Sequence, residues 1–446
     1  MPAIFSVSRF AGIDILTNNS TFNIGVDSKS GVNMLQSWNI SQSIIDRPEY
    51  LEFLKNWKDE NVIKVLSGVR RCGKSTLFEI YKKFLVKNGV DQKQVVSINF
   101  EDFDSSGLYD AEKLHAYLKQ RTPGRRKYYI FLDEIQIVPN FERVVDSLFL
   151  KKNLDIHITG SNAFLLSGEL ATLLSGRYVE LKMLPLSFKE FASACSEKNP
   201  RVLYNEYLKT SFPYAIALND EKQRQYLEGI YSSVVLKDIV KRLAVADVTT
   251  LELIIKYLYA ETGNFQNINK ISNTLTSYGN KVTNKTASRY IDGIENSMLV
   301  YRADRYNVKG RKILANNAKY YAVDNGLRRL IAGDRSEDYG HILENIVYLE
   351  LLRRGYQVFA GVVDNLEVDF LAQKSNGERL YVQVSYNTEK EEILQRELRS
   401  LEAIKDQHPK LLLTMDEILP EQNFNGIIKT GALKWLLNGS HSSPAK

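Results

Sequence analysis

Two glycines, a lysine and two hydroxyl residues stand at a spacing that suits phosphate chemistry. Gly68 and Gly73 enclose four residues and are followed directly by Lys74, Ser75 and Thr76. Glycines let a loop curl so that its backbone N–H groups point inward at phosphate oxygens. At this spacing the lysine reaches the β- and γ-phosphates of a nucleotide, and the serine hydroxyl binds Mg²⁺. The residues therefore predict a loop that binds ATP with Mg²⁺, the alternative being a purely structural loop.

Two adjacent carboxylates follow a short apolar run further along the chain. Ile130-Phe-Leu leads directly into Asp133 and Glu134. Asp133 at a strand end would hold Mg²⁺ through water, and Glu134 would polarise the attacking water. A glutamate here favours hydrolysis over phosphate transfer to a small molecule. The alternative is an ordinary solvated strand end.

Three more polar residues could take part in the reaction. Ser161 and Asn162 follow the apolar run 154–159, where a polar side chain can sense the γ-phosphate or can simply form a turn. Arg177 precedes the run 178–181 and could act as an arginine finger on the nucleotide of a neighbouring subunit in a homo-oligomer, or could form a structural ion pair. The predicted nucleotide-binding residues are Gly68, Arg71, Gly73, Lys74, Ser75, Thr76, Asp133, Ser161 and Asn162. The predicted metal ligands are Ser75 and Asp133, and the predicted catalytic residues are Lys74, Glu134 and Arg177.

Apolar runs and amphipathic segments alternate around these residues. A helix is predicted at 74–90, directly after the glycines, and another at 166–174. Strands are predicted at 62–66, 95–100, 128–132, 154–159 and 178–181. Nearly continuous apolar strands separated by helices are typical of a parallel sheet that is covered on both faces. We therefore expect an α/β fold of the P-loop NTPase class, with a helical region at 199–263 behind it.

These motifs together resemble a known family. The residues that carry the resemblance are Arg70-Arg-Cys-Gly-Lys-Ser-Thr, Leu132-Asp-Glu, Ile158-Thr-Gly-Ser, Ser175-Gly-Arg and Leu186-Ser-Phe-Lys-Glu190. They are similar to motifs of the prokaryotic AAA-family ATPases often called archaeal-type, and the similarity runs from residue 46 to residue 440. The resemblance implies an AAA-like sheet followed by a domain of unknown function that contains a winged helix and a nuclease-like fold.

The segment 264–333 carries a helix-turn-helix pattern followed by a hairpin. Helices are predicted at 268–275 and 283–294, and strands at 299–305 and 319–324. Basic residues on the second helix and at the hairpin tip suit contact with double-stranded DNA. These residues are Lys285, Arg289, Lys309, Arg311 and Lys312. A winged helix that serves only as a lid or a protein contact is the alternative.

The C-terminal segment has the order of a PD-(D/E)xK nuclease core but lacks part of its chemistry. Asp369 and the helix-borne Glu344 stand where the fold needs acids, while Gln383 and Ser385 replace the acid and the lysine of E-x-K. Glutamine is a poorer ligand than glutamate for a hard divalent cation, and serine carries no ammonium group. We expect a restriction-endonuclease-like α/β domain without nuclease activity.

The length of the chain limits the number of domains that it can form. A chain of 446 residues is too long for one hydrophobic core. We predict an extension at 1–43, an ATPase domain at 44–195, a helical lid or linker at 196–263, a winged helix at 264–333 and a nuclease-like domain at 334–446. Met34 is an alternative start.

Charge, cysteines and hydropathy bear on partners and location. The net charge of +6 permits nucleic-acid binding without requiring it. Two cysteines exclude a disulfide framework, and neither a membrane span nor a signal peptide is recognisable, so we expect a cytoplasmic protein. The favoured function is an Mg²⁺-dependent ATPase that acts as a mechanical switch, with DNA as a candidate partner. A DNA-binding scaffold switched by ATP binding alone is the alternative, and an ATP-regulated nuclease comes third.

Overall fold

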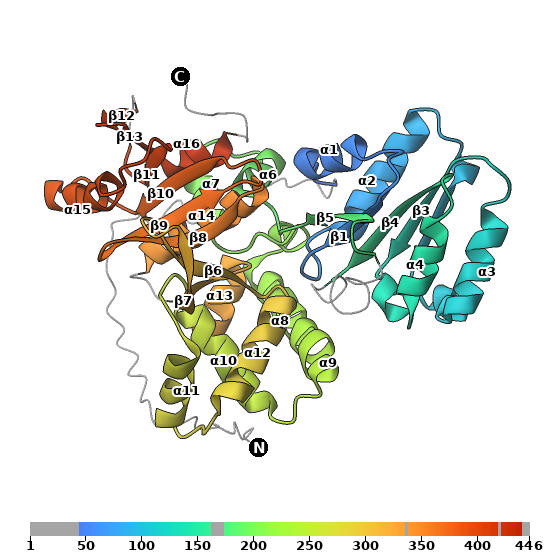
Figure 1. Ribbon diagram of the computed structural model, residues 1–446, viewed down its shortest axis with the longest axis horizontal. Coiled ribbons are helices and arrows are strands. Elements are labelled where there is room, and N and C mark those ends of the chain that lie inside the picture. Colours follow the sequence, from blue (N-terminus) through green and yellow to red (C-terminus); the bar gives the residue numbers. More distant parts are fainter. Residues whose placement is uncertain (1–43, 162–173, 335–337, 418–420, 439–446) are drawn as a thin grey trace, which may run out of the picture. The chain divides into compact units, whose positions relative to one another are not determined.

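The computed structural model describes residues 44–161, 174–334, 338–417 and 421–438 (Figure 1). The predicted N-terminal extension, Asn162 and all but the last residue of the predicted helix at 166–174 lie outside these residues. In the part of the chain that is described, no helix is long and apolar enough to cross a membrane.

A five-stranded parallel sheet holds the first predicted strands. It consists of β1 (Ile63–Ser67), β2 (Val95–Asn99), β3 (Tyr128–Asp133), β4 (Leu154–Gly160) and β5 (Tyr178–Lys182). The strand order is β2-β3-β4-β1-β5, and every pairing is parallel. The expectation of a parallel P-loop-type sheet is confirmed. Because β4 lies between β1 and β3, the ends of these three strands meet at one edge.

Helices cover both faces of this sheet, which explains the nearly continuous apolar character of its strands. One core contains Leu66 and Phe131 together with residues of α1 (Pro48–Asn56) and α2 (Lys74–Lys87). The other core contains Val65 together with residues of α3 (Ala111–Arg121) and α4 (Phe141–Phe149). Alternate residues of one strand thus enter opposite cores, as the pleat of a strand requires.

The next part of the chain is helical, as predicted from its periodicity. It contains α6 (Phe188–Ala194), α7 (Pro200–Tyr207), α8 (Asp220–Ser233), α9 (Lys241–Leu243), α10 (Val248–Ala260), α11 (Ile268–Ser277) and α12 (Asn284–Asn296). A π-helix at Val234–Val240 joins α8 to α9. Thr283 caps α12 by accepting the backbone N–H of Thr286 at 3.2 Å. The apolar stripe of α12, which consists of Ala287, Tyr290, Ile291 and Ile294, is buried.

An eight-stranded mixed sheet forms the rest of the fold, in the order β12-β13-β11-β10-β9-β8-β6-β7. Its strands are β6 (Val300–Asn307), β7 (Lys312–Ala322), β8 (Gln357–Val363), β9 (Leu366–Gln373), β10 (Arg379–Ser385), β11 (Lys410–Thr414), β12 (Gln422–Phe424) and β13 (Ile427–Gly431). The accompanying helices are α13 (Asn325–Ala332), α14 (Tyr339–Arg353), α15 (Glu391–Glu402) and α16 (Ala432–Leu437).

The predicted hairpin is part of this larger sheet. Strands β6 and β7 pair antiparallel, and β6 also pairs in parallel with β8 through Arg305 and Ala360. A single continuous sheet therefore spans the predicted domain boundary between residues 333 and 334.

Candidate nucleotide-binding site

The loop from Gly68 to Gly73 joins β1 to α2 under tight steric constraints. A Cβ atom on Gly68 would lie 2.3 Å from the carbonyl oxygen of Met183, so a side chain cannot be placed there without moving backbone. Gly73 has φ of +105°, a conformation that favours glycine. Helix α2 begins at Lys74, and its N-terminus therefore faces the loop, as anion binding requires.

Lys74 is held inside the loop by oxygen atoms. Its Nζ donates to the carbonyl oxygens of Gly68 at 2.9 Å and Val69 at 3.4 Å, and it lies 3.4 Å from Glu134 Oε1. Burial opposes the charge of this ammonium, but the nearby Glu134, Cys72 and Asp133 together outweigh burial and raise the pKa of Lys74. The lysine is thus a buried, permanently charged cation among the backbone groups of the loop.

Asp133 lies at the carboxyl end of β3, beside two hydroxyl groups. Thr159 Oγ1 donates to Asp133 Oδ1 at 2.5 Å, and the Ser75 hydroxyl also faces this carboxylate. Burial raises the pKa of Asp133, and the hydroxyl groups only partly offset it. A carboxylate next to a hydroxyl at a helix N-terminus is the oxygen donor set that suits Mg²⁺, so the residues present fit this ion.

Glu134 follows Asp133 in a left-handed conformation, with φ of +55°. Its backbone N–H donates to Thr159 Oγ1 at 2.8 Å, its carboxylate accepts from Gln136 Nε2 at 2.6 Å, and Ser161 Oγ also donates to it. Burial alone would raise the pKa of Glu134, but Lys74 and these hydrogen bonds outweigh burial and lower it. An ionised, oriented carboxylate is what a residue that polarises water needs.

Two polar side chains at the end of β4 therefore bind the two acids. Ser161 binds Glu134, while Thr159 binds both Asp133 and the backbone of Glu134. Thr159 belongs to this site but is absent from the predicted site residues. Its signal in the sequence was its place in the same strand end as Ser161.

Several predicted site residues are exposed or partly exposed. Arg71 has φ of +65°, and its side chain and those of Ser75 and Thr76 are exposed. Arg177 is partly exposed, pairs with Asp146 of α4 and lies over the ring of Phe149.

Two arginines that are absent from the predicted site residues connect the loop to other segments. Arg47 donates through Nη1 to the carbonyl oxygen of Cys72 at 3.1 Å, and Arg70 forms ion pairs with Asp238 and Glu101. Arg47 comes directly before a helical proline and Arg70 lies inside the glycine motif. Neither position identifies its partner, because the partners are distant in sequence.

The predicted DNA-contacting residues occupy two surfaces. Lys285 and Arg289 are exposed on α12, where Arg289 also donates to the carbonyl oxygen of Leu243. Arg311 and Lys312 are exposed at the β6–β7 turn, and Lys309 pairs with Asp364 at 2.6 Å.

The predicted nuclease-like acids surround a lysine from another strand. Nζ of Lys319 on β7 lies 2.8 Å from Glu344 Oε1, 2.5 Å from Glu367 Oε1 and 3.8 Å from Asp369 Oδ1. Gln383 accepts the backbone N–H of Asp369 at 3.2 Å. We call Lys319, Glu344, Glu367 and Asp369 the Lys319 cluster. A protein ammonium group thus occupies the centre of these carboxylates.

Comparison with known proteins places the chain in a family. Residues 60–192 match the AAA domain family, and residues 201–338 match a domain of unknown function, DUF8612. An uncharacterized protein of Haemophilus influenzae is 42% identical over 404 residues, which cover 89% of this chain and 100% of the relative. An uncharacterized protein of Methanocaldococcus jannaschii is 31% identical over 369 residues, which cover 78% of this chain and 79% of the relative. Among solved structures, a Walker-type ATPase of Pyrococcus abyssi is 12% identical with a TM-score of 0.47, covering 65% of this chain and 96% of that one. The chain belongs with the Haemophilus and Methanocaldococcus proteins to one family of AAA-type ATPases.

Proposed function

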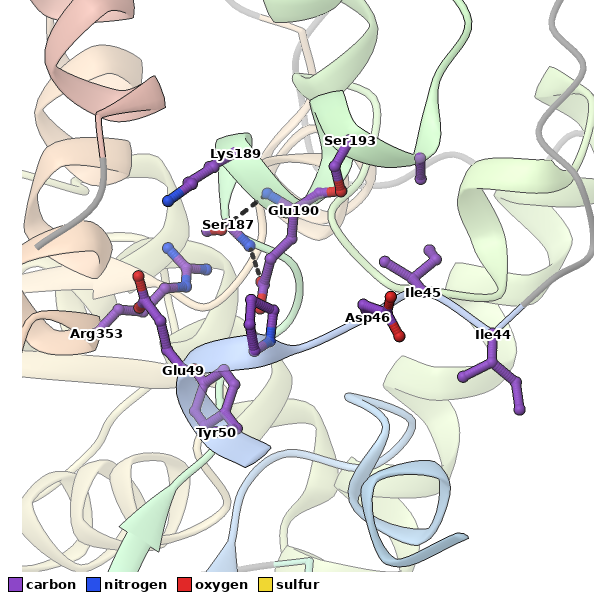
Figure 2. Close-up of a pocket in the computed structure, with 12 residues that line it drawn as sticks. Ile44, Ile45, Asp46, Glu49, Tyr50, Ser187, Lys189, Glu190, Ser193 and Arg353 are labelled. Atoms are coloured by element: carbon purple, nitrogen blue, oxygen red, sulfur yellow. Dashed lines mark hydrogen bonds between the residues drawn. The ribbon is translucent and has the colours of Figure 1, made fainter. Parts of the chain in front are cut away.

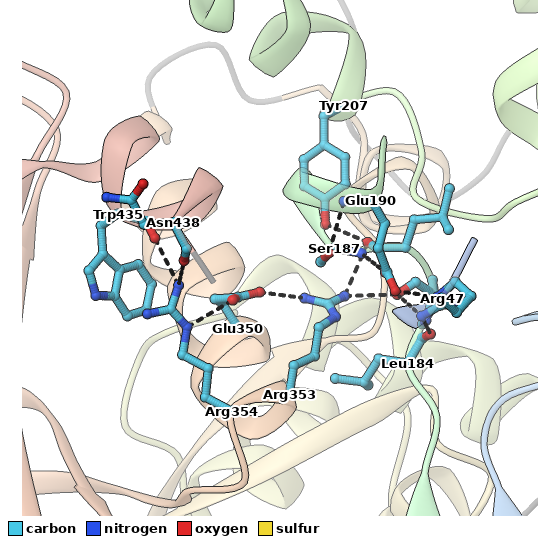
Figure 3. Close-up of polar contacts among 12 residues, drawn as sticks. Arg47, Leu184, Ser187, Glu190, Tyr207, Glu350, Arg353, Arg354, Trp435 and Asn438 are labelled. Carbon is cyan, nitrogen blue, oxygen red and sulfur yellow. Dashed lines mark hydrogen bonds and ion pairs between the residues drawn. The ribbon is translucent and has the colours of Figure 1, made fainter. Parts of the chain in front are cut away.

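We infer that this ATPase uses ATP binding and hydrolysis at residues 68–76 to drive a mechanical switch in the rest of the chain. The observation that carries this proposal is a line of buried and partly buried polar contacts, which begins at the phosphate-binding loop and ends at α16. Figure 3 shows the part of this line from Arg47 to Trp435. We call this line the polar relay. Its members come from segments that are far apart in the sequence.

The first half of the polar relay is centred on Arg47, which is 4% exposed. Besides its bond to Cys72, Arg47 donates to Glu190 Oε1 at 2.5 Å and to the carbonyl oxygen of Leu184 at 2.9 Å. Glu190 in turn accepts the backbone N–H of Ser187 at 2.7 Å, which fixes the start of α6. Charge-assisted bonds of this kind are strong and directional. A displacement of the loop at Cys72 is therefore expected to move α6.

The second half continues from the segment before α6 to the C-terminal helix. Arg353 at the end of α14 donates to the carbonyl oxygens of residues 185 and 186, at 3.0 and 3.2 Å. Glu350 lies 3.7 Å from Arg353 and accepts from Arg354 at 2.9 Å. Arg354 then donates to the carbonyl oxygen of Trp435 in α16 at 2.8 Å. The contacts thus reach the last described helix, through an ion pair and not a hydrogen bond between Arg353 and Glu350.

A pocket beside the polar relay leaves its side chains room to move. It has a volume of 420 Å³ and lies where residues 44–50 meet α6 and α14. Glu49, Lys189, Glu190 and Arg353 line it (Figure 2). A relay enclosed by close-packed apolar side chains would resist rearrangement, whereas this one borders open space.

The proposed chemistry assigns one role to each residue of the site. Lys74 neutralises charge on the β- and γ-phosphates, and Glu134 orients and polarises the attacking water. Ser75 and Asp133 would hold Mg²⁺, which supplies charge neutralisation to the phosphates when it is bound. Ser161 links Glu134 to the end of β4 and so responds to the γ-phosphate. Arg177 would release Asp146 and contact the nucleotide of a neighbouring subunit as an arginine finger. The proposal therefore includes a homo-oligomer.

DNA association and the absence of nuclease activity stay predictions. Exposed Lys285, Arg311 and Lys312 support DNA contact, while Lys309 already has a carboxylate partner in Asp364. The Lys319 cluster supports the loss of nuclease activity, because a lysine fills the place that a cation would need.

Two substitutions test the proposed function. Lys74→Ala removes the buried cation, and we expect it to abolish ATP binding in a fluorescent-nucleotide titration. Glu134→Gln keeps the shape of the site but removes the base. We expect it to retain ATP binding and to lose hydrolysis by about 100-fold or more, the usual contribution of a general base, in a phosphate-release assay.

Glu79→Gln is the matched control, because Glu79 is an exposed residue of the same helix as Lys74. Hydrolysis at the wild-type rate by Glu134→Gln would contradict the assigned mechanism. If Glu134→Gln traps ATP and still supports the biological output, ATP binding alone sets the conformation and the scaffold alternative holds.

A further inference from the structure

Arg70, the third residue of the phosphate-binding loop, is bound by carboxylates from two other segments. Its Nε and Nη2 each donate to an oxygen of Asp238 at 2.8 Å, and its Nη1 donates to Glu101 Oε1 at 3.0 Å. The side chain of Asp238 is 5% exposed, whereas that of Glu101 is 51% exposed. The bond to Asp238 is thus a bidentate, largely desolvated ion pair, the strong kind of arginine contact.

The partner carboxylate belongs to an unusual helical segment. Asp238 lies in the π-helix Val234–Val240, between α8 and α9. Such segments are rare and are frequently found at functional sites. Val234, Val235 and Ile239 of this segment are buried in the same core as residues of α2. A shift of Asp238 therefore disturbs the packing between the helical region and the helix that begins at Lys74.

Arg70 is also electrostatically coupled to the predicted catalytic acid. Its positive charge helps to lower the pKa of Glu134, and the negative charge of Glu134 helps to raise the pKa of Arg70 against the effect of burial. The guanidinium belongs to a residue of the loop predicted to surround the phosphates; it is paired with Asp238 and is close enough to Glu134 for the two charges to interact. An arriving γ-phosphate adds negative charge at this place.

We propose that Arg70 distinguishes nucleoside triphosphates from diphosphates, because the terminal phosphate competes with Asp238 for its guanidinium. The proposal rests on nucleotide binding at the phosphate loop, the proposed function. In the free protein Asp238 holds Arg70. In the triphosphate complex Arg70 turns to the phosphate, and the π-helix segment is released. With a diphosphate bound there is no competitor, and the pair with Asp238 persists.

The released carboxylate is not left as an isolated buried charge. Arg242 lies close enough to Asp238 for the two charges to interact. A second cation beside Asp238 lowers the cost of breaking its pair with Arg70, since an unpaired buried charge is otherwise strongly destabilising. The exchange can therefore be driven by binding of one phosphate group.

The test compares two nucleotides on the full chain. Dissociation constants for ADP and for a non-hydrolysable ATP analogue, each with Mg²⁺, are measured by calorimetry for wild type and three variants. Asp238→Asn removes the competitor, and we expect about tenfold tighter binding of the ATP analogue, the value of one charge-assisted hydrogen bond, with ADP binding unchanged. Arg70→Gln should lose the preference for the triphosphate. Glu101→Gln, which alters the exposed partner of the same guanidinium, should change neither constant by more than about twofold.

Hydrogen exchange gives a second readout that needs no variant. We expect residues 234–240 of the wild type to exchange faster with the ATP analogue than with ADP. Equal effects of Asp238→Asn on both nucleotides, or equal exchange with both, would overturn the proposal. Wild-type binding of ADP establishes the nucleotide site independently, so a failure of the triphosphate preference is distinguishable from a failure of the proposed function.

Discussion

Lys319 forms ion pairs with three carboxylates. Its side chain is 3% exposed, and its charge is surrounded by Glu344, Glu367 and Asp369. Burial opposes this charge, but the acids outweigh burial and raise the pKa of Lys319. For Asp369 burial is the largest cause, and its pKa is raised well above the usual range. The negative charge of this cluster is therefore compensated only while the ammonium group of Lys319 is present.

Replacing Lys319 by methionine should destabilise the fold strongly. The substitution leaves the buried carboxylates of Glu344 and Asp369 without their cation, a change that costs about 3–5 kcal/mol. Urea denaturation measures this loss. Lys309→Met is the matched control, since Lys309 and Asp364 form an exposed pair. It should change the free energy of unfolding by no more than about 1 kcal/mol.

Equal effects of the two substitutions would show that the Lys319 cluster is not a buried charge network. We expect neither wild type nor Lys319→Met to nick supercoiled DNA with Mg²⁺ or Mn²⁺. Nicking that depends on Lys319 would instead mean that the lysine restores the group that Ser385 lacks.

At the scale of elements, local patterns predicted most of the fold. The strands of the first sheet were predictable because burial on both faces makes them continuously apolar. Helix α12 was predictable because Thr283, a residue type that caps helices, precedes apolar residues at helical spacing in the sequence. The π-helix was not, because a change from i+4 to i+5 hydrogen bonding leaves the residue types unchanged. The parallel pairing of β6 with β8 was missed for another reason: it joins segments about fifty residues apart, and no local pattern encodes such a contact.

Helix α12 also carries a pH-sensitive residue near its C-terminal end. Burial raises the pKa of Glu295 to about 7, with a smaller contribution from Asp292, while Arg302 opposes the shift. One carboxylate oxygen of Glu295 is buried without a hydrogen-bond partner. In the folded state this carboxyl thus keeps its proton to about pH 7, whereas the unfolded chain releases it near pH 4.5.

The free energy of unfolding should therefore fall as the pH rises from about 4.5 to about 7, because only the unfolded chain ionises in this window. Glu295→Gln removes the effect. We expect this variant to be more stable than wild type by up to about 3 kcal/mol at pH 8 and nearly equal at pH 4.5. Urea denaturation at both pH values measures the difference, and comparison with the variant cancels the titration of other groups. A difference that does not change with pH would contradict the assigned pKa.

At the scale of the whole chain, the sequence indicated which residues form the candidate site but not what connects them to the rest of the fold. The glycine motif and the two acids at the end of β3 were recognisable because each lies within a short stretch. Arg47, Glu190 and Arg353 are separated by more than a hundred residues, and each is an ordinary charged residue in the sequence. Only the fold brings them together, and with them the proposed path from nucleotide to C-terminal helix.

Hydrogen exchange of α14 and α16 with and without nucleotide tests the central claim most directly. We predict that a non-hydrolysable ATP analogue changes exchange at residues 339–353 and 432–437 of the wild type. The change should be absent in Lys74→Ala, which lacks the phosphate-binding cation, and reduced in Glu190→Gln, which interrupts the polar relay. If the analogue binds the wild type and exchange in both helices stays the same, nucleotide binding is not transmitted to the C-terminal region and the switch does not exist.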